Sequence, residues 1–208
     1  MARRKKRQTR PKKKNKGHRK AYFILLVVLI VFLAVYIGHQ VYQHYQQEQI
    51  IEKRDNAKQL FIKQIAPEAQ AMQNQYHVLA SITIAQAILE SDWGSSKLAA
   101  NYHNLFGIKG SGADSRELST KEYVNGRWII ITDRFKVYPS WDASIRDHAR
   151  LMVDGTTGNA DNYSAVTAAS DYRTAAKALQ QAGYATDPDY ANKLISVIQT
   201  YQLYKYDR

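Results

Sequence analysis

The feature that most constrains this chain is an uncharged apolar run from Ala21 to Gly38. Its 18 residues, as a helix rising about 1.5 Å per residue, span roughly 27 Å, which is close to the hydrocarbon thickness of a bilayer. Tyr22 and Tyr36 lie near its two ends, where a ring that carries a hydroxyl suits the headgroup layer. The run therefore predicts a single transmembrane helix over residues 21–38.

The positive charge of the chain is concentrated before this run. Residues 1–20 hold 12 of the 30 lysines and arginines and no acidic residue, which leaves 18 basic against 18 acidic residues in the remainder. A basic flank marks the cytoplasmic side of a transmembrane helix, so we expect a basic cytoplasmic tail at 1–20 and an extracellular C-terminal part. Because the rest is formally neutral, the charge gives no reason to expect the folded part to bind nucleic acid. A nucleic-acid-binding arm is the alternative interpretation of the basic tail, and the sequence favours the membrane flank, so no nucleic-acid partner is predicted.

A cleaved signal peptide is the alternative interpretation of the N-terminal segment. The apolar run is long for a signal peptide, and no small-x-small pair follows it, so the sequence favours a retained anchor.

Residues 39–60 are polar and rich in glutamine, which indicates a helical extracellular stalk. From residue 61 to 208 the composition is globular, with Pro67 placed near a predicted helix start. The chain has no cysteine, which excludes disulfides, thiolate metal sites and cysteine nucleophiles.

The segment Ser81–Glu90 predicts a core helix, because apolar residues surround most of it. Ser81 is its predicted N-cap. Its polar positions, Thr83, Gln86 and Glu90, are three and four residues apart and so form one stripe, which Trp93 would continue if the last turn holds. Gly94 is the predicted stop.

A β-hairpin is predicted between Leu118 and Phe135, because Asn125-Gly126 separates two β-rich runs. This turn pairs Val124 with Arg127 and Glu122 with Ile129. Further helices are expected after the caps Ser140, Asp171 and Asp187. The predicted fold class is mainly α (α+β), a helical domain with one β-hairpin.

Two carboxylates are candidates for chemistry. A carboxyl buried beside Trp93 has its pKa raised, so Glu90 could donate a proton to a leaving oxygen. Glycoside hydrolysis also needs a second carboxylate, for which Glu122 is the candidate. A solvated Glu90, or one paired with Lys97, is the non-catalytic alternative. His103 and His148 lack metal-ligand spacing, so no metal site is predicted.

The chain resembles glycoside hydrolase family 73, the glucosaminidase-type peptidoglycan hydrolases with a lysozyme-like helical fold. The resemblance rests on several motifs in order, and it covers roughly residues 61–203. Asp92 stands where the family frequently has glycine. The motifs are "AQAILESDWGSSKLA", "NYHNLFGIKG", "STKEYVNGRWIIITDRFKVYPSWDASIRDHARLM" and "GYATDPDYANKLI".

The resemblance implies roles for residues at the matching positions. Glu90 matches the general acid. Glu122 falls where the family places a second carboxylate on a β-hairpin, either to activate water in an inverting reaction or to assist attack by the N-acetyl oxygen of the substrate. Tyr184 matches a tyrosine of the active-site groove, and Asn104 and Phe106 match a motif that lines the groove near the sugar.

Other substrate contacts are expected because sugar rings present flat C–H faces that pack on aromatic rings. Trp93, Tyr138 and Tyr190 are the further aromatic candidates. Gln86 carries an amide that suits N-acetyl or hydroxyl groups, although a buried structural amide is an equal alternative.

The sequence thus predicts a membrane-anchored extracellular endo-β-N-acetylglucosaminidase that cleaves β-1,4 bonds of peptidoglycan glycan strands without a cofactor. An N-acetylmuramidase or lytic transglycosylase of the same fold is one alternative. A non-catalytic wall-binding scaffold is the other.

Overall fold

The computed structural model describes residues 16–124 and 127–207, and the side chains of all of these except 16, 17, 19, 120–124 and 128. The chain divides into two compact units, Met1–Asp55 and Asn56–Arg208. The long helix α1, Lys16–Tyr76, contributes residues to both. Each unit is described by itself.

In the first unit, the described residues form one exposed helix. The predicted span 21–38 lies in α1, and its most apolar 18-residue window has a mean hydropathy of 2.9 with no residue buried. By length and composition this helix can cross a membrane. The segment predicted as a stalk is also helical.

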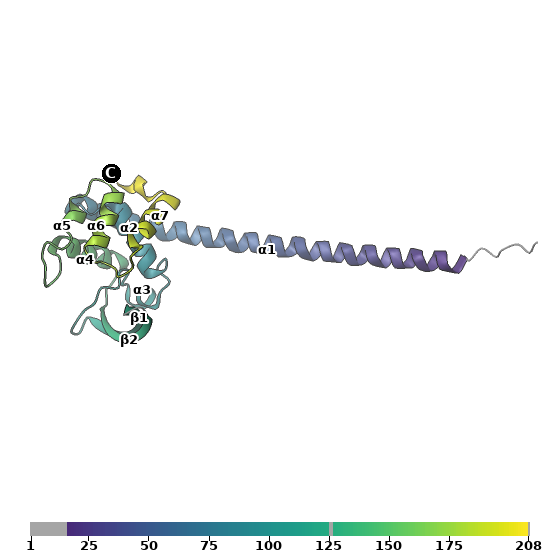
Figure 1. Cartoon of the computed structure of the whole chain (residues 1–208), viewed down its shortest axis with the longest axis horizontal. Coiled ribbons are helices and arrows are strands. Elements are labelled where there is room, and N and C mark those ends of the chain that lie inside the picture. Colours follow the sequence, from purple (N-terminus) through teal and green to yellow (C-terminus); the bar gives the residue numbers. More distant parts are fainter. Residues whose placement is uncertain (1–15, 125–126, 208) are drawn as a thin grey trace, which may run out of the picture. The chain divides into compact units, whose positions relative to one another are not determined.

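The second unit is mainly helical with one two-stranded antiparallel sheet (Figure 1). After the end of α1 its elements are α2 Ala80–Ser91, α3 Lys97–Tyr102, β1 Ser115–Val124, β2 Arg127–Lys136, α4 Trp141–Asp154, α5 Ser164–Thr167, α6 Tyr172–Gln181, α7 Tyr190–Thr200 and the 3₁₀-helix η1 Leu203–Tyr206.

Helix α2 lies in the core of this unit. Every residue from Ala80 to Ile88 is buried, as expected for a helix that is apolar nearly all round. It packs against α6, α7 and η1, whose fully buried residues include Leu179, Leu194 and Leu203.

The start of α2 differs from the prediction, because Ser81 lies inside the helix and does not cap it. The first N–H groups are instead satisfied by remote side chains. Gln73 Oε1 accepts from the Ala80 N–H at 2.7 Å, and Asp207 Oδ1 accepts from the Ser81 N–H at 2.7 Å. Asp207 Oδ2 also accepts from the Ser81 hydroxyl at 2.6 Å. The C-terminal end of the chain therefore fixes the N-terminus of α2.

Pro67 also lies elsewhere than predicted, inside α1 rather than at a helix start. A proline in a helix removes one backbone hydrogen bond and crowds the preceding turn. Buried residues on both sides of it, including Ile65 and Ala69, keep the helix packed, so burial outweighs the local preference.

The predicted caps Ser140 and Asp171 are confirmed. Ser140 Oγ accepts from the Ala143 N–H, and Asp171 Oδ1 accepts from two backbone N–H groups of α6. Asp187 does not cap α7, which begins at Tyr190.

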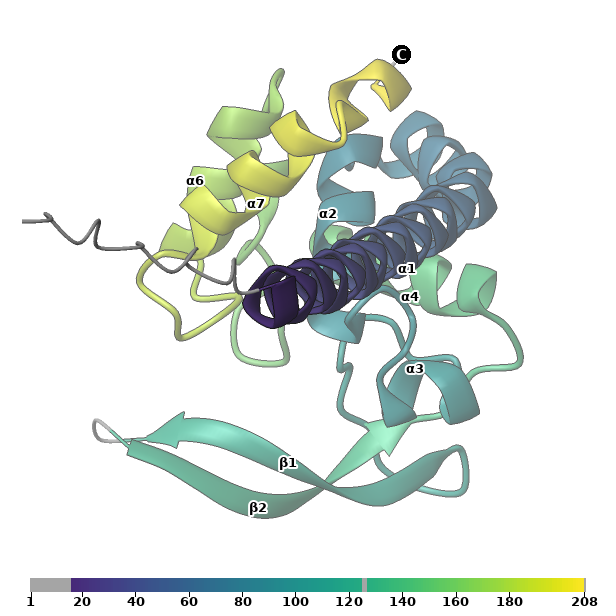
Figure 2. The ribbon, with the colours of Figure 1, turned by 90° about the vertical axis from the view of Figure 1, so that its right-hand side faces the viewer.

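Strands β1 and β2 form a ribbon with the predicted register, in which Val124 pairs with Arg127 and Glu122 with Ile129. The predicted turn, Asn125-Gly126, lies outside the described residues. The ribbon lies beyond α3 and away from α6 and α7 (Figure 2). Its base is joined to the preceding loop by backbone bonds from Gly110 N to Arg134 O (3.0 Å) and from Lys136 N to Ile108 O (2.9 Å).

Candidate active site

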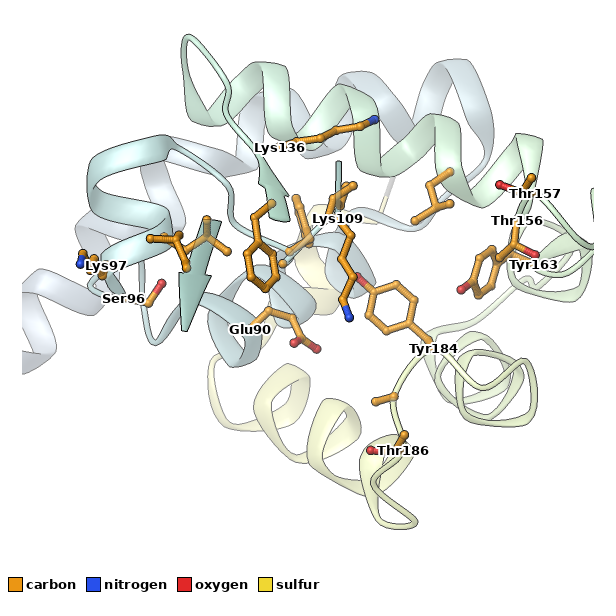
Figure 3. Close-up of a pocket in the computed structure, with 18 of the residues that line it drawn as sticks. Glu90, Ser96, Lys97, Lys109, Lys136, Thr156, Thr157, Tyr163, Tyr184 and Thr186 are labelled. Carbon is orange, nitrogen blue, oxygen red and sulfur yellow. The ribbon is translucent and has the colours of Figure 1, made fainter. Parts of the chain in front are cut away.

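A cleft of about 1260 Å³ opens at the C-terminal end of α2. Its lining comes from α2, the 96–98 and 106–109 segments, the ribbon, the end of α4 and the 184–186 turn. Figure 3 shows Glu90 between Ser96 and Lys97 on one side and Tyr184, Tyr163 and the Thr156–Thr157 segment on the other. The volume exceeds that of most small-ligand pockets, so the cleft suits an extended ligand.

The turn after α2 sets the position of Glu90, the next-to-last residue of the helix. The Ser91 hydroxyl donates to the Ala87 carbonyl at 2.5 Å and accepts from the Gly94 N–H at 2.7 Å. Gly94 has a φ of +75°, and a Cβ there would lie 2.8 Å from the rings of Phe61 and Trp141. Only glycine fits this turn without strain.

Glu90 is exposed to the cleft, which corrects the expectation of a carboxyl buried among apolar groups. The surrounding protein nevertheless desolvates the carboxyl enough to raise its pKa, and a hydrogen bond from Tyr190 partly offsets this rise. A group at the floor of a cleft can reach solvent and still have much of its hydration shell replaced. The raised pKa favours the protonated form that a general acid requires.

Tyr190 holds the Glu90 carboxyl from the first residue of α7. The Tyr190 hydroxyl donates to Glu90 Oε1 at 2.7 Å and accepts from Gln86 Nε2 at 3.3 Å. Both Tyr190 and Gln86 are buried. Tyr190 and Gln86 therefore support the carboxyl from behind, and neither is among the residues that line the cleft.

Tyr184 does line the cleft. Its half-buried ring stacks on Tyr190, with centroids 5.9 Å apart and planes at 16°, and meets Tyr163 edge to face at 6.0 Å. Burial and the nearby Glu90 charge hold the pKa of Tyr184 well above its usual value, so its hydroxyl remains a neutral hydrogen-bond donor.

Phe106 lines the cleft, but Asn104 does not. The Asn104 amide donates to the carbonyls of Ile108 and Lys136 and accepts from the N–H groups of Phe106 and Ile108. With its amide fully used, Asn104 shapes the loop that presents Phe106. The structure gives Asn104 this role in the loop, and its predicted contact with sugar stays a prediction.

Trp93 and Tyr138 also make contacts within the protein. Trp93 leaves the helix with a φ of +60° and packs edge to face on Phe61 and Tyr201. The Tyr138 hydroxyl donates to Asp147 Oδ2 at 2.6 Å. Neither ring lines the cleft.

Position 122 lies in β1, four residues beyond Leu118. Alternate residues of a strand share a face, and Leu118 lines the cleft. The side chain of Glu122 lies outside the described residues.

The sequence interpretation missed several residues of the lining. Tyr163, Leu118 and the pair Thr156–Thr157 all border the cleft, yet they carry no pattern that separates them from ordinary core and loop positions. His148 was noted only as a poor metal ligand, and it stacks under Phe106 at 3.9 Å. Burial lowers the pKa of His148 to about 3, so it packs there as a neutral ring.

Comparison with known proteins shows which family this chain resembles. The glucosaminidase family, described as mannosyl-glycoprotein endo-beta-N-acetylglucosaminidase, matches residues 66–203. The exo-glucosaminidase LytG of Bacillus subtilis is 42% identical over 188 residues, which are 89% of this chain and 65% of LytG. The peptidoglycan hydrolase FlgJ of Escherichia coli is 38% identical over 146 residues, 67% of this chain and 45% of FlgJ. The chain thus spans less than two thirds of these relatives.

Solved structures show the same fold. The catalytic domain of the autolysin Auto from Listeria monocytogenes aligns with a TM-score of 0.67 and 36% identity, covering 75% of this chain and 96% of that domain. An N-acetylmuramoyl-L-alanine amidase from Staphylococcus aureus aligns with a TM-score of 0.68 and 40% identity, covering 73% of this chain and 44% of that one. The predicted mainly helical, lysozyme-like fold is confirmed. The chain belongs to the glucosaminidase family.

Proposed function

We propose that this protein is a peptidoglycan hydrolase, an endo-β-N-acetylglucosaminidase that cleaves β-1,4 bonds of wall glycan with Glu90 as general acid. The observation that carries the proposal is a carboxyl with a raised pKa, hydrogen-bonded to Tyr190, in a cleft of about 1260 Å³. Membership of the glucosaminidase family supports hydrolysis of a glycosidic bond as the reaction. Relatives named as an exo-glucosaminidase, a peptidoglycan hydrolase and an autolysin support the wall glycan as substrate.

The hydrogen bonds of Glu90 indicate which oxygen delivers the proton. Oε1 accepts the Tyr190 hydroxyl proton, so the transferable proton of the neutral acid resides on Oε2. As the bond between the anomeric carbon and the bridging oxygen breaks, Oε2 gives its proton to that oxygen. The resulting carboxylate is then stabilised by Tyr190, whose own proton is directed to it because Gln86 donates to the Tyr190 oxygen.

Glu122 is our proposed second carboxylate. The proposal is supported by sequence spacing: position 122 is four residues beyond Leu118 in β1, alternate residues of a strand share a face, and Leu118 borders the cleft. From there Glu122 would activate water in an inverting reaction, or assist attack by the N-acetyl oxygen of the substrate. Phe106 and Tyr184 are our proposed sugar contacts, since both rings line the cleft beside Glu90.

Replacing Glu90 with glutamine tests the proposal, because it keeps the shape of the side chain and removes its proton. We expect at least a ~10²-fold loss of kcat on purified wall, the lower end for general acid catalysis, with glycan binding retained. Release of reducing ends measures the rate, and co-sedimentation with wall measures binding. If wild type and Glu90→Gln both bind and neither cleaves, the protein is a wall-binding scaffold.

The wall glycan contains two kinds of glycosidic bond, and a second experiment determines which of them the protein cleaves. One relative, from Lactococcus lactis, is named "Probable N-acetylmuramidase", so a muramidase is the second candidate. Mass spectrometry of the digest decides: reducing-end N-acetylglucosamine supports our proposal, whereas reducing-end or anhydro N-acetylmuramic acid supports a muramidase or a transglycosylase. An early fall in strand length indicates endo cleavage, and early release of disaccharides indicates exo cleavage.

We further propose that residues 21–38 anchor the protein, with residues 1–20 cytoplasmic and the domain 61–208 outside the membrane on a stalk of residues 39–60. The apolar 18-residue window of α1, in which no residue is buried, supports this placement. Replacing residues 1–38 with a cleavable signal peptide should move activity from the membrane fraction to the medium. Activity that stays with the membrane would contradict the anchor.

A further inference from the structure

The charged groups that line the cleft are unequally distributed. Among the described residues of the lining, the positive side chains are Lys97, Lys109 and Lys136, and Glu90 carries the one carboxyl. The turn on the far side of Glu90, residues 184–186, is uncharged. The cleft therefore has one basic wall, built by the start of α3, the 106–109 loop and the base of β2.

Two of these three lysines are already balanced by acidic partners. Lys109 Nζ lies 2.5 Å from Asp133 Oδ2, and Lys136 Nζ lies 2.8 Å from Asp147 Oδ2. Neither aspartate belongs to the lining. Lys97 differs, because no hydrogen bond or ion pair joins its side chain to any side chain that the structure describes, a set that leaves out residues 120–124 and 128. It is exposed, and Figure 3 shows it beside Ser96 at one end of the cleft.

We propose that Lys97 binds a carboxylate of the peptide stem on a sugar next to the scissile bond. This inference rests on the proposed function, because it assigns part of the same cleft. N-acetylated glycan with its lactyl groups in amide linkage is uncharged, so an anion in the substrate comes from the stems. A peptide stem is attached to every second sugar of the strand. A strand bound with its scissile bond at Glu90 therefore has a stem near each end of the cleft. Lys97 is a lining lysine with no partner among the described side chains, and it is the cation that we expect such a carboxylate to meet.

Steady-state kinetics on two substrates tests the inference with the full-length chain in detergent. The first substrate is wall from which phosphate-containing polymers have been removed. The second is the same wall after an amidase has removed its stems and the lactyl carboxylates that this hydrolysis frees have been capped as methylamides, so that the strands are uncharged. We expect Lys97→Gln to raise KM about 2- to 5-fold on stem-bearing wall, the range of one exposed ion pair, with kcat unchanged. Lys97→Glu should raise it further, and both variants should match wild type on stem-free strands.

Control variants separate this contact from general charge. Lys63→Gln removes another exposed lysine, on α1, that does not line the cleft. This variant should leave KM unchanged on both substrates. Lys97→Arg keeps the charge and should restore wild-type KM. The KM difference should shrink as salt is raised, because exposed charges are screened.

Four other results would overturn the inference, and each has its own pattern of KM or activity. An equal rise of KM on both substrates would mean that Lys97 touches the glycan itself. A wild-type KM for Lys97→Glu on stem-bearing wall would mean that no anion binds there. A KM effect seen only on wall that retains its phosphate polymers would assign the anion to those polymers. If wild type cleaves neither substrate, the proposed function fails and this inference fails with it.

Discussion

The two sides of the cleft are built differently. On the α2 side, Glu90 is the next-to-last residue of a helix that is buried from Ala80 to Ile88, and the Tyr190 hydroxyl lies 2.7 Å from its carboxyl. On the ribbon side, two strands pair with each other and are joined to the loop at their base, while Ile130 farther out is 72% exposed. A two-stranded ribbon alone is marginally stable. The position of the acid is thus fixed by packing, whereas the position of Glu122 depends on a ribbon with little support.

The largest expected difference between the two sides is in stability. Gly94→Ala, on the α2 side, forces a left-handed φ on alanine and places its Cβ 2.8 Å from the Phe61 and Trp141 rings. The conformational cost is about 1–2 kcal/mol, and overpacking adds about 1–3 kcal/mol. We expect the free energy of unfolding to fall by about 3 kcal/mol, as measured by urea denaturation.

Gly112→Ala, at the base of the ribbon, is the matched control. Gly112 has a φ of +93°, and apart from its chain neighbours no heavy atom lies within 4 Å of the position that a Cβ would occupy. The clash is therefore absent, and only about 1–2 kcal/mol should be lost. Equal losses at Gly94 and Gly112 would mean that the turn after α2 is no more tightly packed than the ribbon base.

The next largest effect concerns the two carboxylates. If Glu122 is the base, Glu122→Gln should lower kcat about 10²-fold, and added azide should restore turnover by attacking the anomeric carbon and forming a glycosyl azide. Glu90→Gln should not be rescued in this way, because azide supplies no proton. Mass spectrometry of the products tests both. Rescue of neither variant would favour the N-acetyl oxygen as the nucleophile and reduce Glu122 to an assisting role.

The same contrast explains what could be predicted from sequence. The helix that carries Glu90, and the register of the ribbon, follow from local patterns: apolar residues nearly all round, and an Asn-Gly turn between β-rich runs. Ser140 and Asp171 are caps for the same reason, since a cap and its N–H partners lie within one turn. Most features decided by adjacent residues were therefore predicted well, and the exception is Asp187, which does not cap α7.

Features decided by distant residues were not. Ser81 resembles an N-cap, but Asp207, 126 positions away, binds its N–H. Asn104 resembles a sugar ligand, but Lys136, 32 positions away, accepts from its amide. Tyr138 and Trp93 find partners on α4 and on α1. A polar or aromatic side chain is suited to both substrate and structure, and only the folded chain determines which one it contacts.

The smallest expected effect tests how firmly the α2 side holds its acid. Burial raises the pKa of Glu90, and the Tyr190 hydrogen bond lowers it. Tyr190→Phe removes the lowering interaction, so the pKa of Glu90 should rise further. Because the acid must be protonated to act, the basic limb of the kcat/KM profile should move to higher pH. The maximum of the kcat/KM profile should fall about 2- to 10-fold, as for the loss of one hydrogen bond.

The control is Tyr204→Phe, at an exposed ring outside the cleft, which should leave the pH profile unchanged. A basic limb that stays in place or moves to lower pH in Tyr190→Phe would show that Glu90 is not the group that sets it.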